Sequence, residues 1–470
     1  MPTSRPNPAR RGGARAATLP PELRRMNLNA AGIDIGAESH YVAVPEGRDP
    51  EGRDVRQFAA FTADLQALAD WLTRCGIETV ALESTGVYWI PLFELLAERG
   101  FDVKLVDPRQ LKSVPGRKTD VVDCQWIQQL HTFGLLAAAF RPDDQVCVLR
   151  SYLRQRAMLV TYASHHIQHM QKALEQMNVK LAHVVSDITG VTGLAIIRAI
   201  LAGERAPEVL AKLRDPRCKH DEETLARALA GNWRAEHLFE LRQALELVEC
   251  YRTRVAACDH EIEAQLARFD DKRGGQHLPD EPRQRKPGRN EPLFDGRHHL
   301  HRLTGVDLTR LDGIDAHTAL KVIGEIGLDM SRWPTEKHFA SWLALAPGNK
   351  VSGGKQISGR TKASASRAAA ALRQGANSLY HSKSALGAYF RRMKARLGAP
   401  KAITATAHKI ACLIYRMLKF GTEYVDRGQD YYQRRYQTRV LSTLTRRAHE
   451  LGYNLIKIDA VAPEPALPSL

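Results

Sequence analysis

The segment "VPGRKTDVVDCQW", residues 114–126, places two aspartates three positions apart at the start of a predicted helix. Asp120 and Asp123 would share one helical face, with their Cβ atoms about 5–6 Å apart. Two further carboxylates belong to apolar strands, since Asp34 lies inside "GIDIG" and Glu83 closes "VALE" just before a turn. A charge in a core strand costs free energy unless it is paired or binds a metal. The set therefore predicts a site for two Mg²⁺ ions that clamp the attacking and leaving oxygens of a phosphodiester.

Each of these carboxylates taken singly also has an ordinary structural explanation. A lone acidic residue is more often a cap, a turn residue or a solvated charge, and Asp120 in particular could be a plain helix N-cap. The metal-site hypothesis therefore depends on the whole set in the order Asp, Glu, Asp-x-x-Asp.

The elements that must position these carboxylates are predicted over residues 29–142. Alternation of polar and apolar residues and the placement of glycines predict two short strands in 31–44 and further strands at 79–83 and 101–107. Helices are expected at 62–76, 87–100 and 121–136. Strands and helices that alternate in this way indicate a central sheet covered by helices.

Residues 144–270 carry a different pattern, that of two long helices. Apolar residues follow steps of three and four from Leu149 to Leu181 and again from Leu238 to Leu266, and Arg156 interrupts the first seam. Such seams predict an antiparallel coiled-coil hairpin, with a first helix about 50 Å long at 1.5 Å per residue. The alternative is the core of an ordinary helical bundle.

The remaining segments differ mainly in composition. Residues 1–28 are rich in Arg, Pro, Gly and Ala and lack a signal-peptide core, so a basic disordered arm is expected there. Residues 271–303 read as a basic linker and 304–427 as mainly helical, while the tail at 428–470 offers no recognisable motif.

The charge balance indicates a polyanionic partner. The chain has 470 residues, 44% of them hydrophobic, and 68 Lys and Arg against 52 Asp and Glu give a net charge of +16. This composition is that of a soluble globular protein, and with no 18-residue apolar run the expected partner is nucleic acid rather than a membrane. The seven cysteines form no CxxC pair, which favours a reducing cytoplasm over a disulfide framework or a zinc site.

Basic residues flank the chemistry-bearing segments. Contacts to nucleic-acid phosphates are expected from side chains beside the paired aspartates and in the segment "KVSGGKQISGRTK", although solvated loop lysines and arginines are the ordinary alternative. The predicted nucleic-acid-binding residues are Lys112, Arg117, Lys118, Lys350, Lys355, Arg360 and Lys362.

The motifs "GIDIG", "ESTG" and "KTDVVDCQW" together resemble the DEDD domain of the insertion-sequence "one-ten" transposases, a family that also includes the Piv-type DNA invertases. The segment "FASWLALAPGNKVSGGKQISGRT" resembles the serine motif of their C-terminal transposase domain. The resemblance covers about residues 29–425. It departs from the family pattern at Ala365 and Ser366, where the family commonly shows a Lys-x-Gly-Asn step, and this puts the local turn in doubt.

The resemblance implies an α/β plus all-α protein. It assigns an RNase H/RuvC-like domain to residues 29–143, a coiled-coil domain to 144–270 and a transposase domain with a catalytic serine to 304–427. Ser352 matches that serine, with Ser358 as the runner-up, and Ser-Gly is otherwise a common turn pair.

The activity implied by the resemblance is recombination of a mobile element with its target. That activity uses donor and target DNA, Mg²⁺ and a structured guide (bridge) RNA, and the protein assembles into dimers and tetramers. The resemblance further implies a bacterial protein that is cytoplasmic and associated with the nucleoid. Two alternatives remain open. A RuvC-like Holliday-junction nuclease would need the carboxylates without serine chemistry, and a sugar-kinase or actin-like ATPase would need further Gly-rich phosphate loops.

Overall fold

The computed structural model describes residues 25–111, 119–278, 288, 290–364 and 366–456. The chain divides into two compact units, Met1–Arg141 and Pro142–Leu470, which are described separately. Most of the predicted basic arm, 1–28, lies outside the described residues, as does the central part of the predicted linker. No helix within the described ranges has the length and apolar character needed to cross a membrane.

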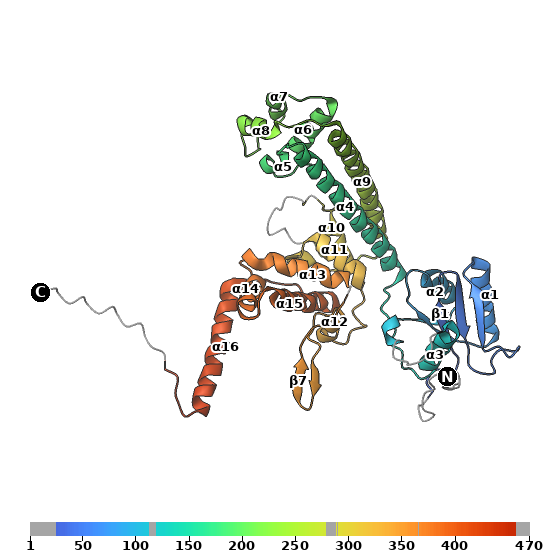
Figure 1. Ribbon diagram of the computed structural model, residues 1–470. Coiled ribbons are helices and arrows are strands. Elements are labelled where there is room, and N and C mark those ends of the chain that lie inside the picture. Colours follow the sequence, from blue (N-terminus) through green and yellow to red (C-terminus); the bar gives the residue numbers. More distant parts are fainter. Residues whose placement is uncertain (1–24, 112–118, 279–287, 289, 365, 457–470) are drawn as a thin grey trace, which may run out of the picture. The chain divides into compact units, whose positions relative to one another are not determined.

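The first unit is a five-stranded mixed sheet with helices on both faces (Figure 1). The strand order is β3-β2-β1-β4-β5, with β1, β2 and β3 antiparallel and β4 and β5 parallel to β1. The strands are β1 (Ala30–Ile35), β2 (Ser39–Ala43), β3 (Val55–Ala59), β4 (Thr79–Glu83) and β5 (Asp102–Val106). The helices are α1 (Thr62–Arg74), α2 (Trp89–Glu98) and α3 (Asp120–Thr132), with a 3₁₀ turn, η1, at Pro108–Gln110.

The two faces of the sheet carry separate cores. Leu68 and Trp71 of α1 and Leu92 of α2 pack in one buried cluster with Ile33 of β1. On the other face, Ile127 of α3 packs in a smaller cluster with residues of β4 and β5. The period-2 alternation of side chains along the strands therefore decides which residues each helix meets.

Helix α3 lies unusually close to β1. A Cβ atom on Gly32 would stand 2.2 Å from the backbone nitrogen of Gln128 and 2.5 Å from the carbonyl oxygen of Cys124. Both atoms belong to helical backbone and cannot rotate away. Only a glycine at this position of β1 permits the observed approach of the helix.

The C-terminal end of α3 is also held to the sheet. The ring Nε2 of the buried His131 lies 2.9 Å from the hydroxyl of Thr79 at the start of β4. Burial, assisted by the charge of Lys104, lowers the pKa of His131 to about 4, so the ring is neutral near pH 7.

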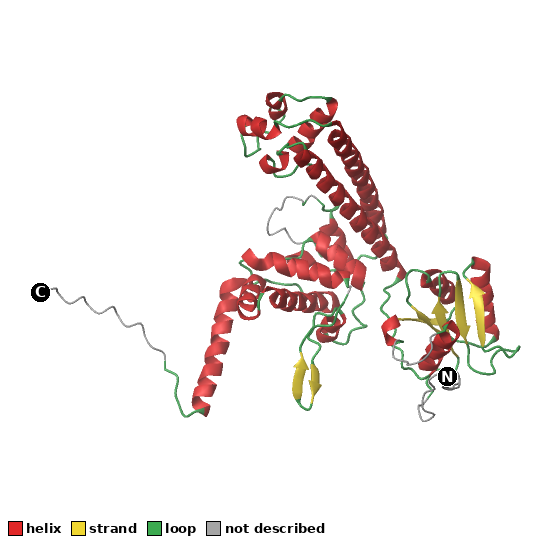
Figure 2. Cartoon of the chain, viewed as in Figure 1, coloured by secondary structure: helices red, strands yellow, loops and turns green. Residues whose placement is uncertain are grey.

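The second unit begins with two long helices, α4 (Asp144–Gln176) and α9 (Ala235–Ala267), that pack along each other over their length (Figure 2). They run antiparallel, because Gln265 near the end of α9 donates to the carbonyl of Gln145 at the start of α4. The short helices at the far end are α5 (Leu181–Val184), α6 (Val191–Ala202), α7 (Pro207–Ala211) and α8 (Glu222–Leu229). They share one buried cluster with residues such as Leu174 and Leu241 of the long helices.

The polar interruption of the α4 seam is a buried ion pair. Arg156 is 2% exposed and its guanidinium binds the carboxylate of Asp259 on α9, which is 3% exposed. Arg156 also donates to the carbonyl of Asn290 at 3.0 Å, and Asp259 accepts from the backbone N–H of Leu293 at 3.3 Å. The segment that follows α9 therefore supplies further hydrogen-bond partners to both members of the buried pair.

The C-terminal part of the second unit is a packed group of helices with one small hairpin. The helices are α10 (Gly296–Thr304), α11 (Ala316–Ile326), α12 (Glu336–Trp342), α13 (Arg367–Ser378), α14 (Ala385–Leu397), α15 (Ala399–Phe420) and α16 (Gly428–Glu450), with 3₁₀ turns η2 (Leu308–Arg310) and η3 (Leu379–His381). The hairpin consists of β6 (Lys350–Ser352) and β7 (Lys355–Ser358). Arg150 of α4 donates to the carbonyls of Gly324 and Glu325, which ties this group to the base of the long helices.

Several elements differ from the sequence predictions. Helix α3 ends at Thr132 rather than 136, because Gly134 adopts a left-handed conformation with φ +68°. Strand β3 was not predicted. Helix α10 occupies part of the expected linker. Asp295 caps this helix, and a buried ion pair between Arg297 and Asp307 holds it in place. Helix α16 forms inside the expected tail, although none of its residues is fully buried.

The close approach at Gly32 gives a first prediction. Gly32→Ala should lower the free energy of unfolding by about 3 kcal/mol, the upper part of the usual overpacking range, because the new methyl group meets helical backbone. The matched control is Gly100→Ala, at φ +86° with open space around the position. It should cost about 1 kcal/mol, from backbone strain alone. Urea unfolding measures both, and equal costs would contradict the proposed steric constraint.

The buried ion pair gives a second prediction. Asp259→Ala should destabilise the chain by about 3–5 kcal/mol, because it leaves a buried guanidinium without its carboxylate. The control is Glu249→Ala, which removes the half-exposed ion pair with Arg198 and should cost less than about 1 kcal/mol. Replacing both members of the buried pair, Arg156→Met with Asp259→Leu, should restore most of the loss in the same unfolding measurement. A double variant as unstable as Asp259→Ala would argue against an unpaired charge as the cause.

Candidate active site

The position of Asp34 follows from the alternation of side chains on β1. Ile33 and Ile35 belong to the core beneath α1 and α2, whereas Gly32 lies against α3. Asp34, two residues beyond Gly32, therefore projects from the α3 face near the end of the strand. Its side chain is only partly buried, unlike the fully covered residues before it.

Glu83 occupies the corresponding place on the next strand. Leu82 packs into the α1/α2 core, and Ala81 packs with Ile127 of α3, so Glu83 also projects on the α3 face. Strands β1 and β4 are parallel, and Ile33 pairs with Leu82. The next residue on each strand is a carboxylate, and these two carboxylates end adjacent strands at the same edge of the sheet.

The first turn of α3 brings the paired aspartates to this edge. Thr119 is the N-cap of the helix, and its hydroxyl accepts from the backbone N–H of Val122 at 3.3 Å. Asp120 is therefore the first helical residue rather than the cap. Asp120 and Asp123 continue the stripe that buries Cys124 against the sheet, and the positive end of the helix dipole stabilises carboxylates in this turn.

Two of these carboxylates act on the buried Cys124 thiol. Burial raises its pKa to about 12, with further contributions from the negative charges of Asp34 and Asp123. Asp34 of β1 and Asp123 of α3 therefore act on the same buried group. We call the set Asp34, Glu83, Asp120 and Asp123 the carboxylate edge.

The carboxylate edge suits a hard divalent cation in its donor chemistry, since every member offers oxygen ligands. Its side chains are not gathered into a ligand cluster, however. Glu83 accepts a 2.5 Å hydrogen bond from the Thr85 hydroxyl two residues on. Across the described residues, no group of three or more His, Cys, Asp or Glu side chains is close enough together to hold a metal ion.

The predicted nucleophile lies on the hairpin of the second unit. Gly353 and Gly354 connect β6 to β7 with φ +55° and +73°, the positive values that a tight two-residue hairpin turn requires. Ser352 pairs with Lys355 at the last rung before this turn, and both are exposed. The hydroxyl of Ser352 makes no hydrogen bond to another described residue.

The runner-up serine has a local structural role. The Ser358 hydroxyl accepts from the backbone N–H of Arg360 at 3.2 Å, and the Arg360 carbonyl accepts from the N–H of Gly348 at 3.1 Å. Ser358 therefore helps to close the base of the hairpin. Ser366, where the sequence departs from the family pattern, caps α13 by accepting from the N–H of Ala369.

The predicted phosphate-binding residues are only partly described. Lys355, Arg360 and Lys362 are exposed on or beside the hairpin. Lys112, Arg117 and Lys118 lie outside the described residues, and so does the side chain of Lys350.

Three residues that position the carboxylate edge were not predicted as such. Gly32 sets the distance of α3 from β1, Thr119 starts α3, and Thr85 holds Glu83. Two of them carried a signal in the sequence. A glycine inside an apolar strand indicates close approach of another backbone, and a threonine just before a helix indicates an N-cap.

Comparison with known protein families identifies the chain. Residues 31–179, which include the whole carboxylate edge, match the DEDD transposase model of the IS110 group. Residues 307–391, which include the serine hairpin, match the model described as "Transposase IS116/IS110/IS902 family". No curated protein matches the chain. The two matches fall on the two segments that carry the predicted chemistry, and the chain belongs to the IS110 family of transposases, enzymes that act on DNA.

Proposed function

We propose that this transposase cuts and rejoins DNA strands at the ends of an insertion sequence, with the carboxylate edge holding Mg²⁺ and Ser352 acting as the nucleophile. A structured guide RNA directs it to donor and target DNA, and the acting form is a homo-oligomer. The sheet domain is RNase H/RuvC-like, since an antiparallel β1–β3 meander is followed by the parallel strands β4 and β5.

One observation carries the metal part of the proposal. Asp34 is next to last in β1, Glu83 is last in the parallel neighbour β4, and both, each following one of the paired residues Ile33 and Leu82, project on the α3 face of the sheet. Asp120 and Asp123 lie in the first turn of α3. Without a cation, negative charges brought together at one edge would repel each other. Bound there, Mg²⁺ would neutralise charge on a phosphodiester and lower the pKa of an attacking hydroxyl.

The protein's own contribution is to fix these groups before DNA arrives. Gly32 and the Thr119 cap place the first turn of α3. Glu83 must leave the Thr85 hydroxyl to join the other carboxylates, and this is a rotation of one partly buried side chain.

The serine step conserves the phosphodiester. The Ser352 oxygen forms a bond to phosphorus as the bond from phosphorus to a deoxyribose oxygen breaks. The serine proton passes to a base, and the released sugar oxygen takes up a proton. Attack by a second strand's hydroxyl reverses the exchange, so the strands are rejoined without an external energy source.

The metal site yields a third prediction. Mg²⁺ alone should raise the melting temperature of the wild-type chain by a few degrees, because a ligand that binds only the folded state stabilises it. Asp120→Asn and Asp123→Asn should abolish this rise and recombination while leaving the metal-free melting temperature nearly unchanged. Asp64→Asn, which alters an aspartate in the first turn of α1, is the matched control. An Asp120→Asn chain with full activity and an intact Mg²⁺ response would rule out the assignment.

The nucleophile yields a fourth prediction. Ser352→Ala should bind DNA as the wild type does but form no covalent protein–DNA adduct, because it lacks the attacking oxygen. A denaturing gel with labelled element-end DNA detects the adduct, and Ser358→Ala should retain it. An adduct that survives Ser352→Ala would exclude this serine, whereas strand cleavage without any adduct in the wild type would favour a simple junction nuclease.

Mixing the two inactive chains tests the proposed assembly. If carboxylates and serine can come from different protomers, Asp120→Asn and Ser352→Ala chains should recover part of the activity together that neither has alone. No recovery under conditions in which the wild type recombines would argue against a site shared between protomers.

A further inference from the structure

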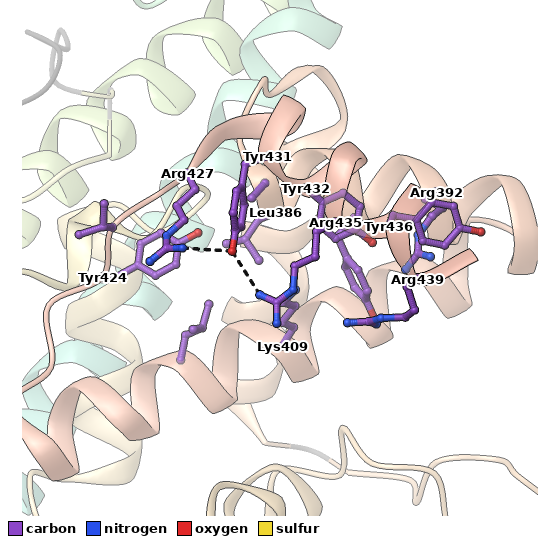
Figure 3. Close-up of a pocket in the computed structure, with 14 residues that line it drawn as sticks. Leu386, Arg392, Lys409, Tyr424, Arg427, Tyr431, Tyr432, Arg435, Tyr436 and Arg439 are labelled. Carbon is purple, nitrogen blue, oxygen red and sulfur yellow. Dashed lines mark hydrogen bonds between the residues drawn. The ribbon is translucent and has the colours of Figure 1, made fainter. Parts of the chain in front are cut away.

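Helices α14, α15 and α16 surround a pocket of about 490 Å³ in the C-terminal part of the chain (Figure 3). Helix α16 lies beyond the segment that matches the transposase family model, which ends at residue 391. The pocket volume is in the range of about 300–1,000 Å³ that is typical of ligand sites.

Aromatic rings form much of the pocket wall. Tyr432 and Tyr436 of α16 are four residues apart and share one helical face. Tyr431 of α16, Tyr424 and Tyr389 of α14 also line the pocket. Tyr436 is 39% exposed, so part of its side chain remains accessible to a ligand. Exposed tyrosine faces are surfaces on which flat rings stack.

Basic side chains lie among these rings. The guanidinium of Arg392 is 4.1 Å from the centre of the Tyr436 ring, and the ammonium of Lys409 is 4.6 Å from that of Tyr389. Arg427 donates to the Tyr431 hydroxyl at 3.1 Å. The rings thus hold the cations in place.

The charged side chains that line the pocket are all basic. Its lining includes Arg392, Lys409, Arg427, Arg435 and Arg439 and no acidic residue among those described. Burial lowers the pKa of Lys409, and the charges of Arg392, Arg435 and Arg439 lower it further. Cations that repel one another in this way form a binding site for an anion.

From this combination we infer that the pocket between α14, α15 and α16 binds a single-stranded polynucleotide, with bases stacked on its tyrosines and phosphates held by its arginines and lysine. A single strand exposes both features at once, whereas a duplex hides its base faces. An acidic peptide would use the cations and leave the rings unused. The inference rests on the proposed function only in that the chain acts on nucleic acid, and it is independent of the carboxylate and serine chemistry.

The first experiment measures the stacking contribution. Full-length chains are titrated with fluorescent oligouridylate, oligothymidylate and a duplex of the same length. Tyr436→Ala should weaken single-strand binding by between about 5-fold and 150-fold, the range for loss of one base stack, and Tyr436→Phe should retain it. The RNA and DNA arms identify which strand the site prefers, and circular dichroism verifies that each variant is folded.

The second experiment measures the phosphate contribution. Arg435→Gln and Arg439→Gln should each reduce the slope of log affinity against log salt by about 0.7, the value for one single-strand phosphate contact. Arg434→Gln removes the same charge from the same helix outside the pocket and should leave the slope unchanged. Ultraviolet cross-linking of bound oligouridylate should label Tyr431, Tyr432 or Tyr436.

The outcomes separate this inference from the proposed function. Single-strand affinity unchanged in Tyr436→Ala, equal competition by polyglutamate, or cross-links only elsewhere would overturn the pocket assignment while leaving the recombination mechanism intact. A wild-type chain that binds none of the nucleic-acid probes would overturn both. An Asp64→Asn chain should bind the probes normally, because Asp64 of α1 belongs neither to the pocket nor to the carboxylate edge.

Discussion

The contact between α3 and β1 at Gly32 is the constraint on which the candidate metal site depends. The helix backbone rests directly on the strand, so the first turn of α3 has almost no freedom to shift along the sheet. The carboxylates of the strand ends and those of the helix start are thereby related through rigid backbone rather than through side-chain contacts. Preorganisation of this kind holds charged groups in fixed relative positions before a ligand arrives.

Elements with strong internal patterns could be predicted from the sequence. The predicted strand at 79–83 coincides with β4, and the predicted long helices coincide closely with α4 and α9, because alternation or repeated apolar spacing marked each one. The predicted carboxylates lie at one edge of the sheet, since strand ends and register follow from the same alternation. How near their side chains come to one another depends on rotamers and on the segment before α3, and these leave no trace in local sequence.

Elements stabilised by distant partners could not be predicted in this way. The hairpin strands are exposed on both faces, with Val351 and Ile357 among the most exposed apolar residues, so no burial pattern identified them. Helix α10 depends on the Arg297–Asp307 pair, and α16 depends on packing against α14. The tyrosines and arginines of α16 have helical spacing, yet the pocket appears only when α14 and α15 supply its other wall.

The Arg156–Asp259 pair divides the long helices into two parts that pack against different partners. Beyond it, the far ends of α4 and α9 and the short helices between them share a self-contained core. On its near side, Arg150 and the segment after α9 tie the helices to the C-terminal group. Because sliding one helix by a turn would set each charge against apolar side chains, the pair fixes alignment at the boundary of these parts. The outer part can therefore be lengthened, shortened or exchanged during evolution. The length of the α4–α9 hairpin would change, while the alignment of the two helices at the Arg156–Asp259 pair would stay the same.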